Sequence, residues 1–144
     1  MKSLTDLVRQ IIRRYPLSCL LTVAIWVVCM IPIPETPLSD VSMIDKWTHI
    51  VMFMTQSLMM SFEFAKNKKK TAPAVFVWRK DCIRFLLTYA WIVPTAMGGM
   101  IELAQAYLTN GVRNGDFIDF VADGLGAVLA VVIGILLVVT RAKA

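Results

Sequence analysis

The sequence has few cysteines, and they are too scattered to form a redox or metal motif. The 144 residues contain three cysteines and no CxxC pair. Cys19 and Cys29 fall within an apolar run, so we interpret them, together with Cys82, as small hydrophobic residues without a disulfide or metal role. The chain also contains no evident internal repeat, which argues against a solenoid or other array.

The sequence also lacks an activated nucleophile and the polarity of a soluble domain. Ser39, Ser42 and Thr109 stand in no motif that would activate a hydroxyl. The hydrophobic residues make up 58% of the chain and the mean hydropathy is +0.67. Soluble domains are usually about 45–50% apolar. This excess excludes a small water-soluble core and indicates that the bilayer is the solvent.

Four apolar stretches predict four transmembrane helices, at about 16–33, 47–64, 84–108 and 118–140. Each approaches or exceeds the roughly 20 residues that cross a hydrocarbon core, where the backbone must satisfy its own hydrogen bonds. The second stretch is the weakest because His49, Gln56 and Glu63 interrupt it, and a re-entrant or tilted segment is the alternative there. We expect residues 1–144 to form one all-α domain, a four-transmembrane-helix bundle.

The first fifteen residues predict a separate amphipathic helix. Apolar side chains recur at helical spacing from Leu4 to Tyr15, while Lys2, Asp6 and Arg9 take the opposite face. This pattern is typical of an interfacial helix that lies on the inner leaflet. A cleaved signal peptide is the alternative, but no small-x-small cleavage site follows Ile31.

Local signals predict where several helices begin, end or bend. Asp45 is a candidate cap for the second helix, and Asn110-Gly111 is a turn signal that closes the third. Pro94 predicts a kink within the third helix. Asp116 stands where the fourth helix begins, and the helix dipole favours an acidic residue there.

The basic residues predict the orientation in the membrane. Thirteen of the fifteen lysines and arginines lie before the first stretch, between the second and third or at the first residue of the third, or after the fourth. Only Lys46 and Arg113 fall on the other side. The positive-inside rule therefore places both termini and residues 66–70 in the cytoplasm. We expect residues 66–70 to contact anionic lipids, and we expect no binding of nucleic acid.

Ionisable residues converge at the outer ends of three predicted helices. His49, Glu102 and Asp123 each lie on the order of 6–10 Å below a helix end, at 1.5 Å per residue. Ionisable groups in membrane helices usually face the bundle interior and have a function. Purely structural pairing with Lys46 or Arg113 is the alternative. The complete set of candidate residues is Lys46, His49, Glu102, Gln105, Arg113, Asp116, Asp119 and Asp123.

Small residues predict which face of the fourth helix points inward. A small-xxx-small stripe lets another helix approach closely. Asp119 and Asp123 lie on or beside this stripe, so we expect them to point into the bundle. The stripe consists of Ala122, Gly126, Ala130 and Gly134.

Three motifs, in order and with matching spacing, resemble those of the VanZ-like family over about residues 45–134. The first is the segment Asp45-Lys46-Trp-Thr-His49, and the second is a Glu-x-x-Gln motif at 102–105. The third runs from Arg113 through Asp119 and Asp123 to Gly126-Ala127. The family often has Asn where this chain has Asp123, which is one visible departure.

The resemblance implies a small bacterial protein of the cytoplasmic membrane, a multi-pass protein of the cell envelope. The founding member of the family is associated with resistance to the glycopeptide antibiotic teicoplanin. We expect a ligand at the outer leaflet: a lipid-linked envelope precursor, a phospholipid head group or a lipophilic glycopeptide. Whether this protein is an enzyme is left open.

The residues suggest roles for such a ligand. Arg113 and Lys46 suit an anionic group, and His49 and Glu102 are the acid–base, or catalytic, candidates. Gln105 suits orientation by a hydrogen bond. The aspartates, Asp116 among them, suit ligand binding by holding these cations in place.

Two other classes of protein and a metal remain as alternatives. A small four-helix proton- or cation-coupled transporter would use Glu102, although such sites usually lie near the bilayer midplane. A non-catalytic envelope interaction protein would only occupy a ligand. We expect no cofactor, with a divalent cation at Asp119 and Asp123 as the alternative, because oxygen ligands suit such ions.

The orientation is tested by cysteine labelling in intact cells. A membrane-impermeant thiol reagent should modify an engineered cysteine at Ser39, which the charge pattern places outside, but should not modify one at Asn67. The opposite labelling pattern would invert the predicted topology and remove the candidate site from the outer face.

Overall fold

The computed structural model describes residues 3–32, 43–69, 75–110 and 115–141. All regular structure within these ranges is helical, so the all-α prediction is confirmed. The helices are α1 (Leu4–Arg14), α2 (Pro16–Met30), α3 (Ile44–Lys69), α4 (Val75–Phe85), the π-helical turn η2 (Leu86–Ala90), α5 (Trp91–Leu108) and α6 (Phe117–Arg141).

Two of these helices are long and apolar enough to cross a membrane. The first is the continuous helix Lys80–Leu108, and the second is Phe117–Val138. The α2 helix has only 15 residues, so it is long enough for a membrane span only together with α1. The two helices are bent by 99° relative to each other. Helix α3 is long but carries polar residues along its length. Two of the four predicted spans are thus supported by length and composition, and the other two stay predictions.

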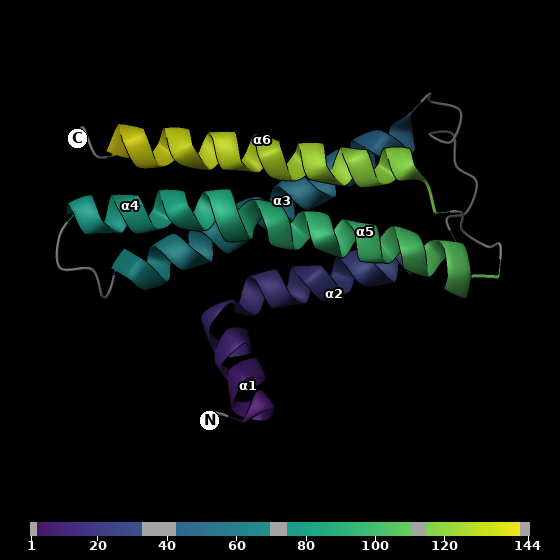
Figure 1. Ribbon diagram of the computed structural model, residues 1–144, viewed down its shortest axis with the longest axis horizontal. Coiled ribbons are helices and arrows are strands. Elements are labelled where there is room, and N and C mark those ends of the chain that lie inside the picture. Colours follow the sequence, from purple (N-terminus) through teal and green to yellow (C-terminus); the bar gives the residue numbers. More distant parts are fainter. Residues whose placement is uncertain (1–2, 33–42, 70–74, 111–114, 142–144) are drawn as a thin grey trace.

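The long helices lie side by side in one bundle, while α1 projects away from it (Figure 1). The α4–η2–α5 rod and α6 run along the long axis, and α3 has its most extensive contact with α6. The beginning of α6 and the end of α5 lie at the same end of the bundle. This arrangement brings the polar helix ends together there.

The predicted helix boundaries lie within three residues of the observed ones, except that α3 extends to Lys69 and α4 already begins at Val75. Helix α3 begins at Ile44, so Asp45 lies within its first turn instead of preceding the helix. Asn110 has a φ of 51° just beyond the end of α5, and asparagine is among the residues that best tolerate this left-handed conformation. Asp116 precedes the first residue of α6 and accepts a hydrogen bond from the Ile118 backbone N–H at 2.8 Å, as a helix cap does.

Pro94 lies inside α5, and a wider π-helical turn precedes it in the same helix; the kink predicted at Pro94 stays a prediction. Proline has no N–H to donate to the carbonyl four residues earlier, which belongs to Ala90. The π-helical turn Leu86–Ala90 ends at this residue. Such wide turns are a known way to accommodate a lost helical hydrogen bond. The rod therefore remains one helix from Lys80 to Leu108.

The small-residue stripe of α6 faces the bundle, as its spacing predicts. Ala122, Gly126 and Ala130 are buried. A Cβ added at Gly126 would collide with the backbone carbonyl of Ile50 and would lie 3.0 Å from the Met54 nitrogen. The backbones of α3 and α6 therefore approach so closely that no side chain fits between them at this point.

Two glycines of α6 form a matched pair for testing this packing. Gly126→Ala should lower the free energy of unfolding by about 1–3 kcal/mol, the usual cost of overpacking. Gly124→Ala should leave stability unchanged or slightly higher, because its Cβ would meet only Thr95 Cγ2 at 3.6 Å and alanine favours helices. Thermal unfolding in detergent measures both. Equal effects of the two substitutions would contradict the close α3–α6 contact.

Candidate functional site

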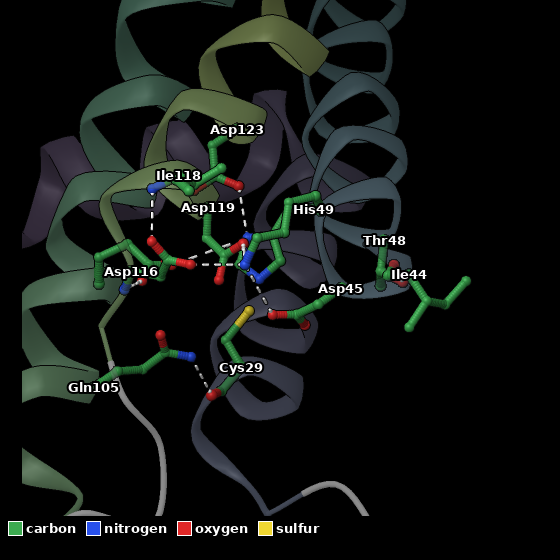
Figure 2. Close-up of polar contacts among 12 residues, drawn as sticks. Cys29, Ile44, Asp45, Thr48, His49, Gln105, Asp116, Ile118, Asp119 and Asp123 are labelled. Atoms are coloured by element: carbon green, nitrogen blue, oxygen red, sulfur yellow. Dashed lines mark hydrogen bonds and ion pairs between the residues drawn. The ribbon is translucent and has the colours of Figure 1, made fainter. Parts of the chain in front are cut away.

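Four ionisable side chains from three helices gather inside one end of the bundle. Glu102 comes from α5. His49 comes from α3, and Asp119 and Asp123 come from α6 (Figure 2). Their exposed fractions are 1%, 7%, 4% and 0%, respectively. The three helices thus bring these groups to a common level, and the bundle shields them from its surroundings.

His49 is the centre of this cluster. A hydrogen bond of 2.8 Å joins its Nδ1 to Asp123 Oδ1, and Glu102 Oε1 lies 4.0 Å from the same nitrogen. Among the described residues, one carboxylate oxygen of each acid has no hydrogen-bond partner: Glu102 Oε1 and Asp123 Oδ2. Asp123 also packs against Gly98, where an added Cβ would collide with its carboxylate. Gly98 therefore provides the space that the Asp123 side chain occupies.

Lys46 forms a second part of the cluster with two aspartates. Its Nζ lies 2.7 Å from Asp116 Oδ2 and 2.8 Å from Asp119 Oδ1. Burial alone would lower the pKa of Lys46, but the hydrogen bonds to these carboxylates outweigh burial and raise the pKa above its ordinary value. The hydrogen bond from Lys46 in turn lowers the pKa of Asp116. Lys46 is thus charged, and two carboxylates already neutralise it.

Asp116 connects the beginning of α6 to α5. Its backbone N–H donates to Glu102 Oε2 at 2.7 Å. The neighbouring Gly115 lies against the Glu102 carbonyl, where an added Cβ would collide. One carboxylate oxygen of Glu102 is therefore held by the backbone at the start of α6, while the other points toward His49.

Of the remaining predicted residues, Gln105 stands apart from the cluster and Arg113 is not described. Gln105 is buried, but its Nε2 donates to the Cys29 carbonyl at 2.8 Å, so it joins α5 to the end of α2 (Figure 2). Arg113 lies outside the residues that the structure describes. The anion-binding role expected for Arg113 therefore remains a prediction.

Acidic side chains outnumber basic ones at this site. Among the described residues, five carboxylates surround His49 and Lys46: those of Asp45, Glu102, Asp116, Asp119 and Asp123. Isolated buried carboxylates are costly unless they are paired, protonated or bound to a cation. The arrangement thus suits protons, a metal ion or a ligand that offers hydrogen-bond donors.

A hollow of about 500 Å³ opens beside the cluster, between α5 and the start of α6. Glu102 and Asp116 contribute the charged part of its wall. The remaining wall is mostly apolar and includes Leu103, Phe117 and Phe120. A molecule with both an apolar part and a polar head group matches this lining.

A second buried polar network lies further along α3 and was not anticipated as a site. Glu63 accepts hydrogen bonds from the backbone N–H groups of Leu17 and Ser18, both at 3.0 Å, and so caps α2. Gln56 donates to Thr22 Oγ1 at 2.8 Å. The signal was present in the sequence, because His49, Gln56 and Glu63 recur every seven residues on one helix face.

No protein-family model, curated protein or solved structure matches this chain. The VanZ-like resemblance therefore rests on the three motifs alone.

Replacing Lys46 tests whether the folded cluster depends on the positive charge of this lysine. Lys46→Met should lower the free energy of unfolding by about 3 kcal/mol, because it leaves the buried Asp119 carboxylate without its partner. The double variant Lys46→Met with Asp119→Asn should recover part of this loss. Thermal unfolding in detergent provides the measurement.

Lys68→Met is the matched control. Lys68 also pairs with one aspartate, Asp81, at 2.7 Å, but both side chains are more than a third exposed, at 39% and 34%. Exposed pairs contribute about 0–1 kcal/mol. Equal losses for Lys46→Met and Lys68→Met would show that Lys46 does not support a buried charge.

Proposed function

We propose that this protein is a VanZ-like membrane protein that binds the head group of an amphiphilic cell-envelope ligand. It does so at the outer-leaflet end of a helical bundle in the bacterial cytoplasmic membrane. The observation that carries the proposal is a buried ionisable cluster next to a largely apolar hollow. Glu102 belongs to both, since it contacts the cluster and lines the hollow.

The lining of the hollow narrows the chemistry of the ligand. Its two charged residues are carboxylates, Glu102 and Asp116. Because Lys46 is already paired with Asp116 and Asp119, Arg113 is the residue that would bind an anionic group of the ligand. Carboxylates accept hydrogen bonds from hydroxyl and ammonium groups. The ligand is therefore a lipid-linked saccharide precursor or an aminophospholipid, whose head groups offer such donors.

Residue roles follow from this geometry. Glu102 accepts a hydrogen bond from the head group, and His49 exchanges a proton with Glu102 within the cluster. Lys46 holds Asp116 and Asp119 in position. Binding of an envelope lipid in this way would contribute to glycopeptide resistance, the property associated with the founding member of the family.

A proton- or cation-coupled transporter is the second candidate. The observation that favours it is the row of buried polar side chains along α3, which extends from His49 through Gln56 to Glu63 over about 21 Å at 1.5 Å per residue. However, both carboxylate oxygens of Glu63 accept hydrogen bonds from α2. Among the carboxylates that the structure describes, those that keep a buried oxygen without a hydrogen bond lie in the cluster at His49. The asymmetry favours binding at one end over passage through the bundle.

Blocking the hollow tests the proposed ligand site without altering the cluster. Ala106 lines the hollow, so Ala106→Trp should fill it. We expect lipid extraction and mass spectrometry of the detergent-purified protein to show at least about tenfold less of the co-purified amphiphile for this variant. Glu102→Gln should also lose the ligand while unfolding at a similar temperature, because it retains the shape and removes a charge.

Val128→Trp is the matched control, since Val128 is an exposed residue of α6 that does not line the hollow. It should retain the wild-type amount of ligand. Lipidomics of envelopes with and without the protein gives the identity of the lipid. Equal amounts of amphiphile with wild type, Ala106→Trp and Val128→Trp would overturn the proposal.

A further inference from the structure

We propose that His49, Glu102 and Asp123 form a binding site for a divalent first-row transition-metal ion. One ligand atom from each residue lies within 4.8 Å of the other two, and all three residues are buried. This site shares Glu102 and His49 with the ligand site proposed above, but it requires no bound amphiphile.

The distances suit a metal of this class. Bonds from zinc to histidine nitrogen and to carboxylate oxygen are about 2.0–2.2 Å, so two ligand atoms in a tetrahedral site lie about 3.4 Å apart. The Nδ1 of His49 is 2.8 Å from Asp123 Oδ1 and 4.0 Å from Glu102 Oε1. These two separations bracket the required value. Shifts of about half an ångström bring these two pairs to the tetrahedral separation, and the Glu102 and Asp123 ligand atoms already lie within 4.8 Å of each other. The ion would replace the proton between His49 and Asp123.

The unpaired oxygens point to a ligand. Both residues are more than nine-tenths buried, yet Glu102 Oε1 and Asp123 Oδ2 accept no hydrogen bond from the part of the chain that the structure describes. Most buried polar atoms in proteins have a partner. A cation bound between the two carboxylates and His49 would be coordinated by Glu102 Oε1. It would also neutralise the charge of the Asp123 carboxylate, to which Oδ2 belongs.

The structure also favours this group over a neighbouring one. Asp45, His49 and Asp119 form an alternative set at similar separations. In that set Asp119 and Asp45 already lie 2.8 and 3.9 Å from Lys46 Nζ, and a second cation beside an ammonium group would be repelled. Lys46 forms no ion pair with Glu102 or Asp123 among the described contacts.

The surroundings hold the three ligands in place. The second Glu102 oxygen accepts the Asp116 N–H, which orients the first oxygen toward His49. Gly98 leaves the space for Asp123, and the Phe53 ring stacks on the His49 ring with centroids 6.3 Å apart. Outer contacts of this kind orient metal ligands and influence affinity. Since the protein supplies three ligands, a fourth position remains for water or for a group in the hollow.

Metal analysis of the purified protein tests this site. After incubation with Zn²⁺ or Mn²⁺ and removal of unbound ion, elemental analysis should find about one ion per chain for at least one of the two metals. Glu102→Gln and Asp123→Asn should each weaken binding at least tenfold, as measured by competition with a chelator. Asp45→Asn and the distant Asp81→Asn should bind like wild type.

A stability measurement keeps the test decisive if a variant folds poorly. The metal should raise the unfolding temperature of wild type, and a chelator should reverse this rise. His49→Ala should unfold at a temperature that does not respond to either. Absence of stoichiometric zinc and manganese in wild type would overturn the proposal, and so would loss of metal with Asp45→Asn but not with Asp123→Asn. If wild type retains the lipid but binds neither zinc nor manganese, the metal site alone is overturned and the amphiphile proposal stands.

Discussion

The structure depends on the burial of polar side chains by α3 within an otherwise apolar bundle. His49, Gln56 and Glu63 project from one face of this helix, and each is at most 5% exposed. An unpaired buried polar group costs about 1–3 kcal/mol, so each must find a partner on another helix. Helix α6 supplies Asp123, and α2 supplies Ser18, Thr22 and its own N-terminus. The polar face of α3 therefore determines which helices surround it.

These pairings are available only because the helices approach closely. Gly126 removes the side chain that would separate α6 from the Ile50 carbonyl of α3. Gly98 does the same for the Asp123 carboxylate on the α5 side. Small residues allow such contacts in membrane bundles, where van der Waals packing and interhelical hydrogen bonds replace the hydrophobic effect. The glycines are thus part of the site, although they carry no chemistry themselves.

The two buried networks differ in a way that bears on function. In the network along α3, the Glu63 carboxylate is fully paired, because both of its oxygens accept hydrogen bonds from α2. The His49 network has more acids than bases among the described residues and leaves two oxygens unpaired. Saturated hydrogen bonding is expected of a group that only holds helices together. The carboxylate oxygens without hydrogen bonds at the His49 end are therefore where a metal, a proton or a head group can bind.

The sequence by itself determined the helices, the two long apolar spans and the level at which the ionisable residues lie. Helical periodicity and the rise per residue carry this information, which is why His49, Glu102 and Asp123 were expected to meet. Only the tertiary structure decided the partners. It assigned Lys46 to Asp116 and Asp119, directed Gln105 to the Cys29 carbonyl, and made Glu63 the cap of α2. These choices depend on how each helix is rotated and how closely it crosses its neighbours, and contacts between distant segments set both.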